Sequence, residues 1–156
     1  MNKKPIQRAL IVGATSGIGK ETALLLLQNG WILGLAGRRE ENLKELQQLA
    51  PERIHIQAID ICQEDATDRL LELIEEMGGM DLYLHCSGIV HQNYQLTPEI
   101  ELRPLETNGT GFVRMVTAAF HYFAQQKKGH LAVISSIAGT KGLGAAPAYS
   151  ATKRFQ

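Results

Sequence analysis

The sequence predicts an α/β fold in three layers, with a doubly wound parallel sheet between two layers of helices. Two observations predict it. Short apolar runs rich in β-branched residues alternate along the chain with longer runs in which apolar residues recur every three or four positions. The short runs are apolar on both pleat faces, as in strands covered on both sides. The 156 residues, 44% of them hydrophobic, suit a single domain over residues 1–156.

The first half of the chain supplies three strands and three helices. The strands are predicted at residues 8–13, 31–36 and 53–59. The helices are predicted at residues 17–29, 40–49 and 64–77, each closely followed by a glycine or proline that favours its end. The side chains expected to form the buried faces of the second and third helices are Leu43, Leu46, Leu49, Leu70, Leu71, Ile74 and Met77.

The second half supplies two more strands, at residues 81–86 and 129–135, and one long helix at residues 106–126. Apolar side chains at helical spacing predict that helix, namely Phe112, Val116, Ala119, Phe120 and Phe123. Residues 139–147 form the one long loop expected, and it follows the fifth strand. Because ligands of open α/β sheets bind beyond the carboxyl ends of the strands, we expect a site near this loop.

Charge and cysteine content exclude several function classes. Sixteen basic residues balance sixteen acidic ones, so no net field attracts nucleic acid or an anionic membrane. No apolar stretch approaches the roughly 18 residues that a membrane helix needs. Cys62 and Cys86 are too few for a disulfide framework, which indicates a reducing, cytoplasmic location. His85, Cys86 and His91 lack the paired spacing of metal ligands, so no metal is expected.

Residues 13–19, Gly-Ala-Thr-Ser-Gly-Ile-Gly, join the first strand to the first helix. Glycines there permit a tight turn and a close approach of phosphate, while the helix N-terminus offers N–H groups. A P-loop needs glycine, four residues and then Gly-Lys-Ser/Thr. Ala14 stands where its first glycine belongs and Glu21 where its Ser/Thr belongs. A P-loop is therefore excluded, and a nucleotide-binding loop is favoured over a purely structural turn.

With this G-x-x-x-G-x-G spacing, the chain resembles the short-chain dehydrogenase/reductase family in its classical branch. The resemblance covers residues 8–156 and implies a Rossmann-like sheet whose strands follow the order 3-2-1-4-5. Further matching positions appear in the family's order and are Asp60, Ile61, Asn108, Ser136, Tyr149 and Lys153.

The chain also departs from the family in two ways. Where the family usually has Asn-Asn-Ala-Gly after the fourth strand, residues 85–88 read His-Cys-Ser-Gly, so His85 stands where an amide is usual. Family members run to roughly 250 residues, whereas this chain ends soon after Lys153. The resemblance therefore implies a dinucleotide-binding domain that lacks the sixth and seventh strands, and we expect a C-terminally incomplete fragment or truncated product.

The resemblance implies a catalytic group of Asn108, Ser136, Tyr149 and Lys153. A free tyrosine has a pKa near ~10, and a nearby ammonium lowers it, which brings Tyr149 closer to acid–base use at neutral pH. Ser136 would orient the substrate oxygen, and Asn108 would hold a water behind Lys153. Taken singly, each residue has an ordinary structural interpretation, such as a surface helix pair or a strand-end cap. Their joint order and spacing favour catalysis.

The end of the second strand bears on cofactor choice. An NAD site would place Asp or Glu there, whereas this chain has Arg38 and Arg39, whose guanidinium groups suit a 2′-phosphate. The alternative is a solvated basic turn balanced by Glu40 and Glu41. Asp60 is expected near the adenine amino group, although a helix N-cap is its alternative role. The residues expected to contact the cofactor are Gly13, Thr15, Ser16, Gly17, Ile18, Gly19, Arg38, Arg39, Asp60, Ile61, Cys86, Ser87, Gly88, Tyr149 and Lys153.

These features predict an NAD(P)-dependent oxidoreductase that interconverts a carbonyl and a secondary alcohol, with NADP(H) favoured. A small-molecule substrate and a homo-oligomer, dimer or tetramer, are expected. The alternatives are a non-catalytic nucleotide-binding or sensing module and an inactive fragment of such an enzyme. The pair Tyr149 and Lys153 argues against a sensor, which has no use for a proton donor.

Overall fold

The computed structural model describes residues 7–156 and has the predicted α/β class and layers. Its five strands are all parallel and follow the order β3-β2-β1-β4-β5, as expected. Each strand starts and ends within two residues of its predicted limits. The strands are β1 (Arg8–Val12), β2 (Ile32–Gly37), β3 (Ile54–Ala58), β4 (Leu82–His85) and β5 (His130–Val133).

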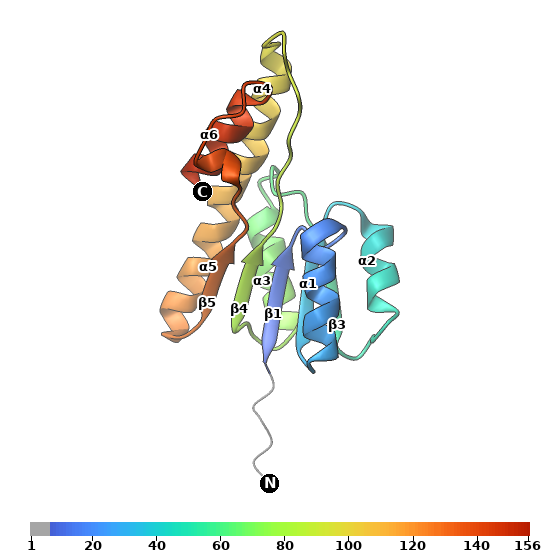
Figure 1. Ribbon diagram of the computed structural model, residues 1–156. Helices are drawn as coiled ribbons and strands as arrows, with labels where there is room; N and C mark the ends of the chain where they lie inside the picture. Colours follow the sequence, from blue (N-terminus) through green and yellow to red (C-terminus); the bar gives the residue numbers. More distant parts are fainter. Residues whose placement is uncertain (1–6) are drawn as a thin grey trace.

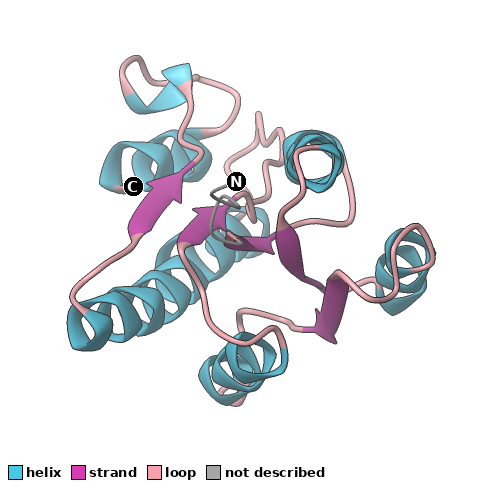
Figure 2. Cartoon of the chain, turned by 90° about the horizontal axis from the view of Figure 1, so that it is seen from below, coloured by secondary structure: helices cyan, strands magenta, loops and turns pink. Residues whose placement is uncertain are grey.

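Helices cover both faces of the sheet (Figures 1 and 2). One face carries α1 (Gly17–Gln28) and α2 (Glu40–Gln47), and the other carries α3 (Ala66–Glu76) and α5 (Phe112–Gln126). Because side chains alternate along a strand, β1 supplies both cores. Ala9 and Ile11 pack into the first core, while Leu10 and Val12 pack into the second.

The long helix is the main correction to the predicted elements. Helical structure begins at α4 (Pro98–Pro104), continues through a π-helical segment η1 (Leu105–Gly111) and then enters α5. The prediction that the helix starts at residue 106 is therefore wrong. Pro104 has no N–H to donate to the carbonyl one turn back, so the regular ladder is interrupted there and the wider π turns follow.

Two further elements and one loop lie at the carboxyl ends of the strands. A 3₁₀ turn, η2 (Ile137–Gly139), follows β5, and α6 (Pro147–Phe155) carries Tyr149 and Lys153. Residues 86–97 form a second long connection that the sequence did not indicate. Figure 1 shows α4 and α6 extending together beyond the ends of β4 and β5.

Three predicted core positions are exposed. Leu49 lies beyond the end of α2 and is 59% exposed, and Leu71 and Phe120 are 43% and 60% exposed. Leu73 takes the buried position expected of Leu71, because the face of α3 that packs on the sheet carries Leu70, Leu73 and Ile74. Among residues 7–156, no helix is both long and apolar enough to cross a bilayer.

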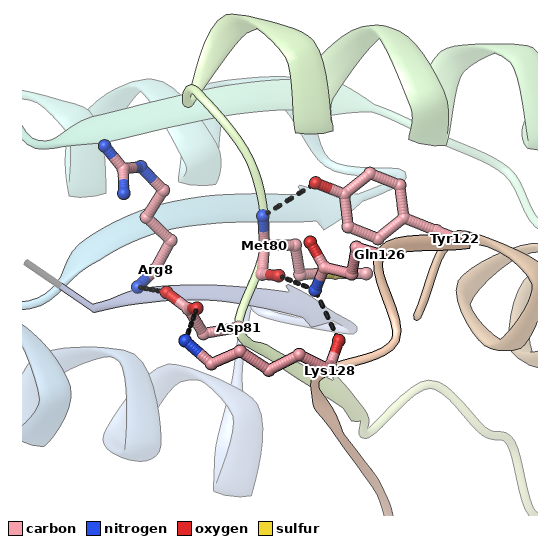
Figure 3. A network of polar contacts seen from close by, with 6 residues as sticks. All are labelled: Arg8, Met80, Asp81, Tyr122, Gln126 and Lys128. Carbon is pink, nitrogen blue, oxygen red and sulfur yellow. Dashed lines mark hydrogen bonds and ion pairs between the residues drawn. The ribbon is translucent and has the colours of Figure 1, made fainter. Parts of the chain in front are cut away.

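A polar network fastens the amino ends of the strands (Figure 3). Arg8 N donates to Asp81 Oδ2 at 3.0 Å, and the other oxygen of Asp81 lies 3.7 Å from Lys128 Nζ. Gln126 Nε2 donates to the Met80 carbonyl at 2.9 Å, and Met80 N donates to Tyr122 Oη at 3.3 Å. These bonds hold the end of α5 against the starts of β1 and β4.

His85, the last residue of β4, is buried in the core rather than facing solvent. Its Nδ1 lies 2.8 Å from Tyr83 Oη, and its ring packs edge-on against Phe112. Its Nε2 is buried with no hydrogen-bond partner among the described residues. Burial, together with the nearby charge of Lys153, lowers the pKa of His85 from 6.5 to about 4.

We expect the stability of the fold to fall as the pH drops through the range between these two pKa values. Above pH 6.5, His85 is neutral in both the folded and unfolded states, whereas below it the unfolded state takes up the proton first. By pH 4 the loss should amount to about 3 kcal/mol. Urea unfolding at pH 7 and pH 5 measures it. His85→Asn should remove most of the difference, while the exposed control His91→Asn should keep it. Equal pH dependence in wild type and His85→Asn would contradict the assignment.

Candidate active site

The carboxyl ends of the strands enclose a cavity of about 700 Å³. Thirteen of the fifteen predicted cofactor residues line it and come from four separate segments, whereas Tyr149 and Lys153 do not line it. The thirteen are Gly13, Thr15, Ser16, Gly17, Ile18, Gly19, Arg38, Arg39, Asp60, Ile61, Cys86, Ser87 and Gly88. The sequence missed further lining residues, which are Val12, Gly37, Ile59, Ile89, Thr107 and Ile134. Of these, Val12 and Gly37 are the last residues of β1 and β2, and Ile59 directly follows β3, so each lies just before predicted residues.

The glycine loop is shaped by backbone packing. Gly13 has a φ of +90°, and a Cβ on it would lie 2.6 Å from Ser87 N. A Cβ on Gly19 would overlap the carbonyl oxygen of Gly13. Only glycine therefore lets the end of β1, the start of α1 and the loop after β4 meet this closely.

The start of α1 suits an anion. The first-turn N–H groups of a helix have no carbonyl partner within it, and three residues of this turn, Gly17, Ile18 and Gly19, line the cavity. No acidic side chain stands in the turn, and Ser16 does not cap it. The helix dipole adds partial positive charge at the same place. This cradle fits the pyrophosphate of a dinucleotide.

The two arginines after β2 have different surroundings. Arg39 reaches across to the glycine loop, where its Nη2 donates to Thr15 Oγ1 and Ser16 Oγ at 2.7 Å each. Arg38 is exposed, lines the cavity, and makes no hydrogen bond or ion pair among the described residues. Arg39 therefore braces the loop, whereas the guanidinium of Arg38 is free to meet a ligand.

Asp60 and Ile61 lie at the exit of β3. Cys62 N donates to Asp60 Oδ1 at 3.0 Å, so one carboxylate oxygen closes a local turn. The Ile61 carbonyl accepts a hydrogen bond from Arg114 Nη1 at 2.6 Å, which fixes this segment against α5. Asp60 is not the helix N-cap that the sequence left open, because α3 begins at Ala66 with Asp65 as its N-cap, and Asp60 also lines the cavity.

Asn108 is fully buried in the π-helical segment. Its Oδ1 accepts from Ile89 N and its Nδ2 donates to the Ile89 carbonyl, both at 2.8 Å. Nδ2 also lies 3.3 Å from Thr152 Oγ1 on α6. One amide therefore joins the loop after β4 to the helix that carries the predicted catalytic pair.

Lys153 lies at the edge of the cavity. Its Nζ donates to the Ile134 carbonyl at 3.0 Å and lies 5.9 Å from the centre of the Tyr149 ring. A Cβ on the cavity-lining Gly88 would lie 3.5 Å from Lys153 Nζ and 3.3 Å from Asn108 Oδ1. Burial lowers the pKa of Lys153 from its ordinary 10.5. The lysine thus borders both the cavity and Asn108.

Gln156 bridges the backbone of Asn108 to Lys153. Its Nε2 donates to the Asn108 carbonyl at 2.8 Å, and its Oε1 accepts from Lys153 Nζ at 2.7 Å. The sequence did not indicate this contact. Gln156 lies between Asn108 and Lys153, the two residues that the resemblance connects through a water.

The remaining predicted residues have mixed outcomes. Ser136 is half-buried, and its Oγ accepts from Ala138 N at 3.1 Å, so it caps η2 and still has a hydroxyl hydrogen to donate. His85 does not line the cavity. Burial raises the pKa of the Cys86 thiol to about 11, so the thiol stays protonated at neutral pH. Within residues 7–156, no cluster of three His, Cys, Asp or Glu side chains could hold a metal ion.

Known proteins resemble the chain over nearly its whole length. The family model for short chain dehydrogenases matches residues 7–155. A Myxococcus xanthus protein named as an uncharacterized oxidoreductase is 35% identical over 99% of this chain and 64% of its own length. Dehydrogenase/reductase SDR family member 7B of Xenopus tropicalis is 31% identical over 92% of this chain and 50% of its own length. The chain thus spans less than two thirds of these relatives.

Solved structures share the fold. Serine dehydrogenase from Escherichia coli matches with a TM-score of 0.88 and 27% identity, over 96% of this chain and 70% of that protein. A variant of actinorhodin polyketide ketoreductase with NADPH matches with a TM-score of 0.87 and 26% identity, over 99% of this chain and 62% of that protein. The matched family and the named relatives are oxidoreductases, and the sheet order, glycine cradle and Tyr149–Lys153 pair occur together in this chain. The chain belongs to the short chain dehydrogenase family.

Proposed function

We propose that the protein is an NADP(H)-dependent oxidoreductase that interconverts a carbonyl and a secondary alcohol on a small molecule. The observation that supports this proposal most directly is that Gly88 borders both the cofactor cavity and a predicted catalytic residue. This residue lines the cavity whose glycine cradle fits a pyrophosphate, and it also borders Lys153. A non-catalytic nucleotide-binding module would need only the cradle.

The chemistry divides between cofactor and protein. The nicotinamide, when bound, supplies or accepts the hydride. Tyr149 holds the proton that passes to the carbonyl oxygen, and the Lys153 ammonium favours the phenolate that remains. Ser136 donates its hydroxyl hydrogen to the same substrate oxygen and orients it. Asn108 holds the loop after β4 and α6 in place through Ile89 and Thr152.

Arg38 supports the preference for NADP(H). Its guanidinium is exposed at the cavity, so a 2′-phosphate could pair with it without breaking a contact. The closed form of serine dehydrogenase, 27% identical over 96% of this chain, is complexed with NADP⁺, and the ketoreductase structure holds NADPH. Arg39 contributes indirectly, because it already binds Thr15 and Ser16.

Arg38→Ala should weaken NADPH binding by about 10- to 100-fold and leave NADH binding within a few-fold, because a charged hydrogen bond is worth about 1.5–3 kcal/mol. Arg39→Ala should weaken both cofactors alike, since it loosens the shared glycine loop. Fluorescence titration measures both, with the exposed Arg103→Ala as a matched control. Equal loss of affinity for NADPH and NADH in Arg38→Ala would mean that Arg38 belongs to a solvated basic turn and has no role in cofactor choice.

Tyr149→Phe should abolish turnover and leave NADPH affinity within a few-fold, since only the proton-donating hydroxyl is removed. Turnover is followed at 340 nm as NADPH oxidation with a panel of aldehydes and ketones, and as NADP⁺ reduction with serine and other hydroxy acids. Full activity in the variant would mean that another group supplies the proton. NADPH binding by the wild type with no turnover on any member of the panel would favour the sensing module.

We also propose a cytoplasmic homo-oligomer. Both cysteines are free thiols, as in a reducing compartment. An apolar groove runs between η1, α5 and α6, where Leu105, Val113 and Phe155 are exposed. Exposed apolar surface of this kind favours association.

Val113→Asp should therefore shift the protein toward a monomer, because a buried carboxylate without a partner opposes association. Size-exclusion chromatography with light scattering measures the mass. Leu25→Asp makes a matched change at an exposed position on α1, which covers the opposite face of the sheet, and should leave the mass unchanged. A wild type that is monomeric at all concentrations would remove the oligomer proposal.

A further inference from the structure

The carboxylate of Glu101 on α4 caps the helix that carries the predicted catalytic pair. Its Oε2 accepts a hydrogen bond from Ala148 N at 2.8 Å. Ala148 is the second residue of α6, and its N–H has no carbonyl partner within the helix. The residue before α6, Ala146, has no side chain able to cap. Glu101 therefore supplies from a different helix the cap that the local sequence lacks.

The second oxygen of Glu101 is held by Asn93 in the loop after β4. Asn93 is buried, and its Nδ2 donates to Glu101 Oε1 at 2.8 Å and to the Thr97 carbonyl at 2.9 Å. Its Oδ1 accepts from Thr97 N at 3.0 Å, and its own N donates to the Ala145 carbonyl at 2.7 Å. Every polar group of this amide is engaged, so its orientation is fixed and it can only present a donor to Glu101.

The loop between Asn93 and Thr97 contains a strained backbone conformation. Leu96 has a φ of +52°, a left-handed conformation that a non-glycine residue rarely adopts. Such a residue persists where its surroundings over-determine it. The bonds of Asn93 to both backbone groups of Thr97 do so here. Three segments of chain, residues 93–97, α4 and the start of α6, therefore meet at one carboxylate.

We infer that Glu101 is a positioning residue for Tyr149, and that Asn93 orients Glu101 for this task. Tyr149 follows Ala148 directly, so the bond to Ala148 N fixes where α6 begins and how its first turn is rotated. A negative charge at this end of the helix is also stabilised by the helix dipole. Neither side chain touches the cavity. The role in catalysis rests on the proposed function, whereas the capping geometry does not.

Glu101→Gln is the first test, because a glutamine amide has only one acceptor where two donors converge. Amide exchange at Ala148 should quicken by about 10-fold, since one charge-assisted bond is weakened. The ring ¹³Cζ resonance of Tyr149, assigned with Tyr149→Phe, should shift in the same variant. Glu99→Gln removes the same charge from the same helix and should leave both signals unchanged. An unchanged Ala148 amide, or equal effects of the two variants, would overturn the inference.

A polarity swap separates positioning from general damage. In Asn93→Asp with Glu101→Gln, the aspartate accepts from the glutamine amide, whose oxygen again faces Ala148 N, while the bond from Asn93 Nδ2 to the Thr97 carbonyl is lost. The double variant should recover part of the Ala148 protection and move the Tyr149 resonance back toward its wild-type position, whereas Asn93→Asp alone places two carboxylates together and should do neither. Failure of the double variant to recover either signal, while it remains folded, would contradict the proposed geometry.

Turnover completes the test. With a carbonyl substrate that the wild type accepts, Glu101→Gln should lower kcat by about 10- to 100-fold, as expected of a small misplacement of a reacting group. NADPH affinity and KM should stay within a few-fold, and the double variant should recover part of the lost kcat. Unchanged kcat with a shifted Tyr149 resonance would reduce Glu101 to a structural cap. If the wild type turns over no carbonyl, the proposed function fails, and the positioning role is decided by the Ala148 and Tyr149 signals.

Discussion

The side-chain amide of Asn108, which lies in a helix, makes the two hydrogen bonds that a backbone peptide group would otherwise make. It exchanges two hydrogen bonds with the backbone of Ile89, as a neighbouring strand would. Buried backbone groups need partners, and β4 has already ended at this point, so the helix supplies them. The cavity wall at Gly88 and the position of α6 through Thr152 both follow from this contact. The π-helical turns place this buried side chain next to the lining residues Gly88 and Ile89.

The strand order, the layers and the glycine cradle could be predicted because their signals are local. Each strand is a short apolar run between turn residues, and Gly13 and Gly19 stand where any Cβ would strike backbone. Arg38, Asp60 and Gly88 come soon after the ends of β2, β3 and β4. Parallel strands bring such positions to one edge of the sheet whatever the details of packing. The gathering of these residues around one cavity follows from that topology alone.

Other features depend on contacts between distant segments. Pro104 is visible in the sequence, but the π-helical turns after it also require the packing of Asn108 and Gly111 against the loop and Ile61. Leu71 and Phe120 lie at helical spacing, yet the sheet takes the neighbouring face of each helix. The cap on α6 joins Glu101 to Ala148, 47 residues apart. Periodicity carries no information on such a pair, so the second long connection and its network were not predicted.

The polar network lies at the amino ends of the strands (Figure 3), whereas the residues that line the cavity lie at and beyond their carboxyl ends. Among the described residues, the hydrogen bonds and the ion pair of this network involve none of the residues that line the cavity. Changes at well-separated positions add nearly independently. The loops that meet a ligand are therefore free to diversify in sequence while the sheet stays fastened. A family built on this plan can change its substrates without rebuilding its fold.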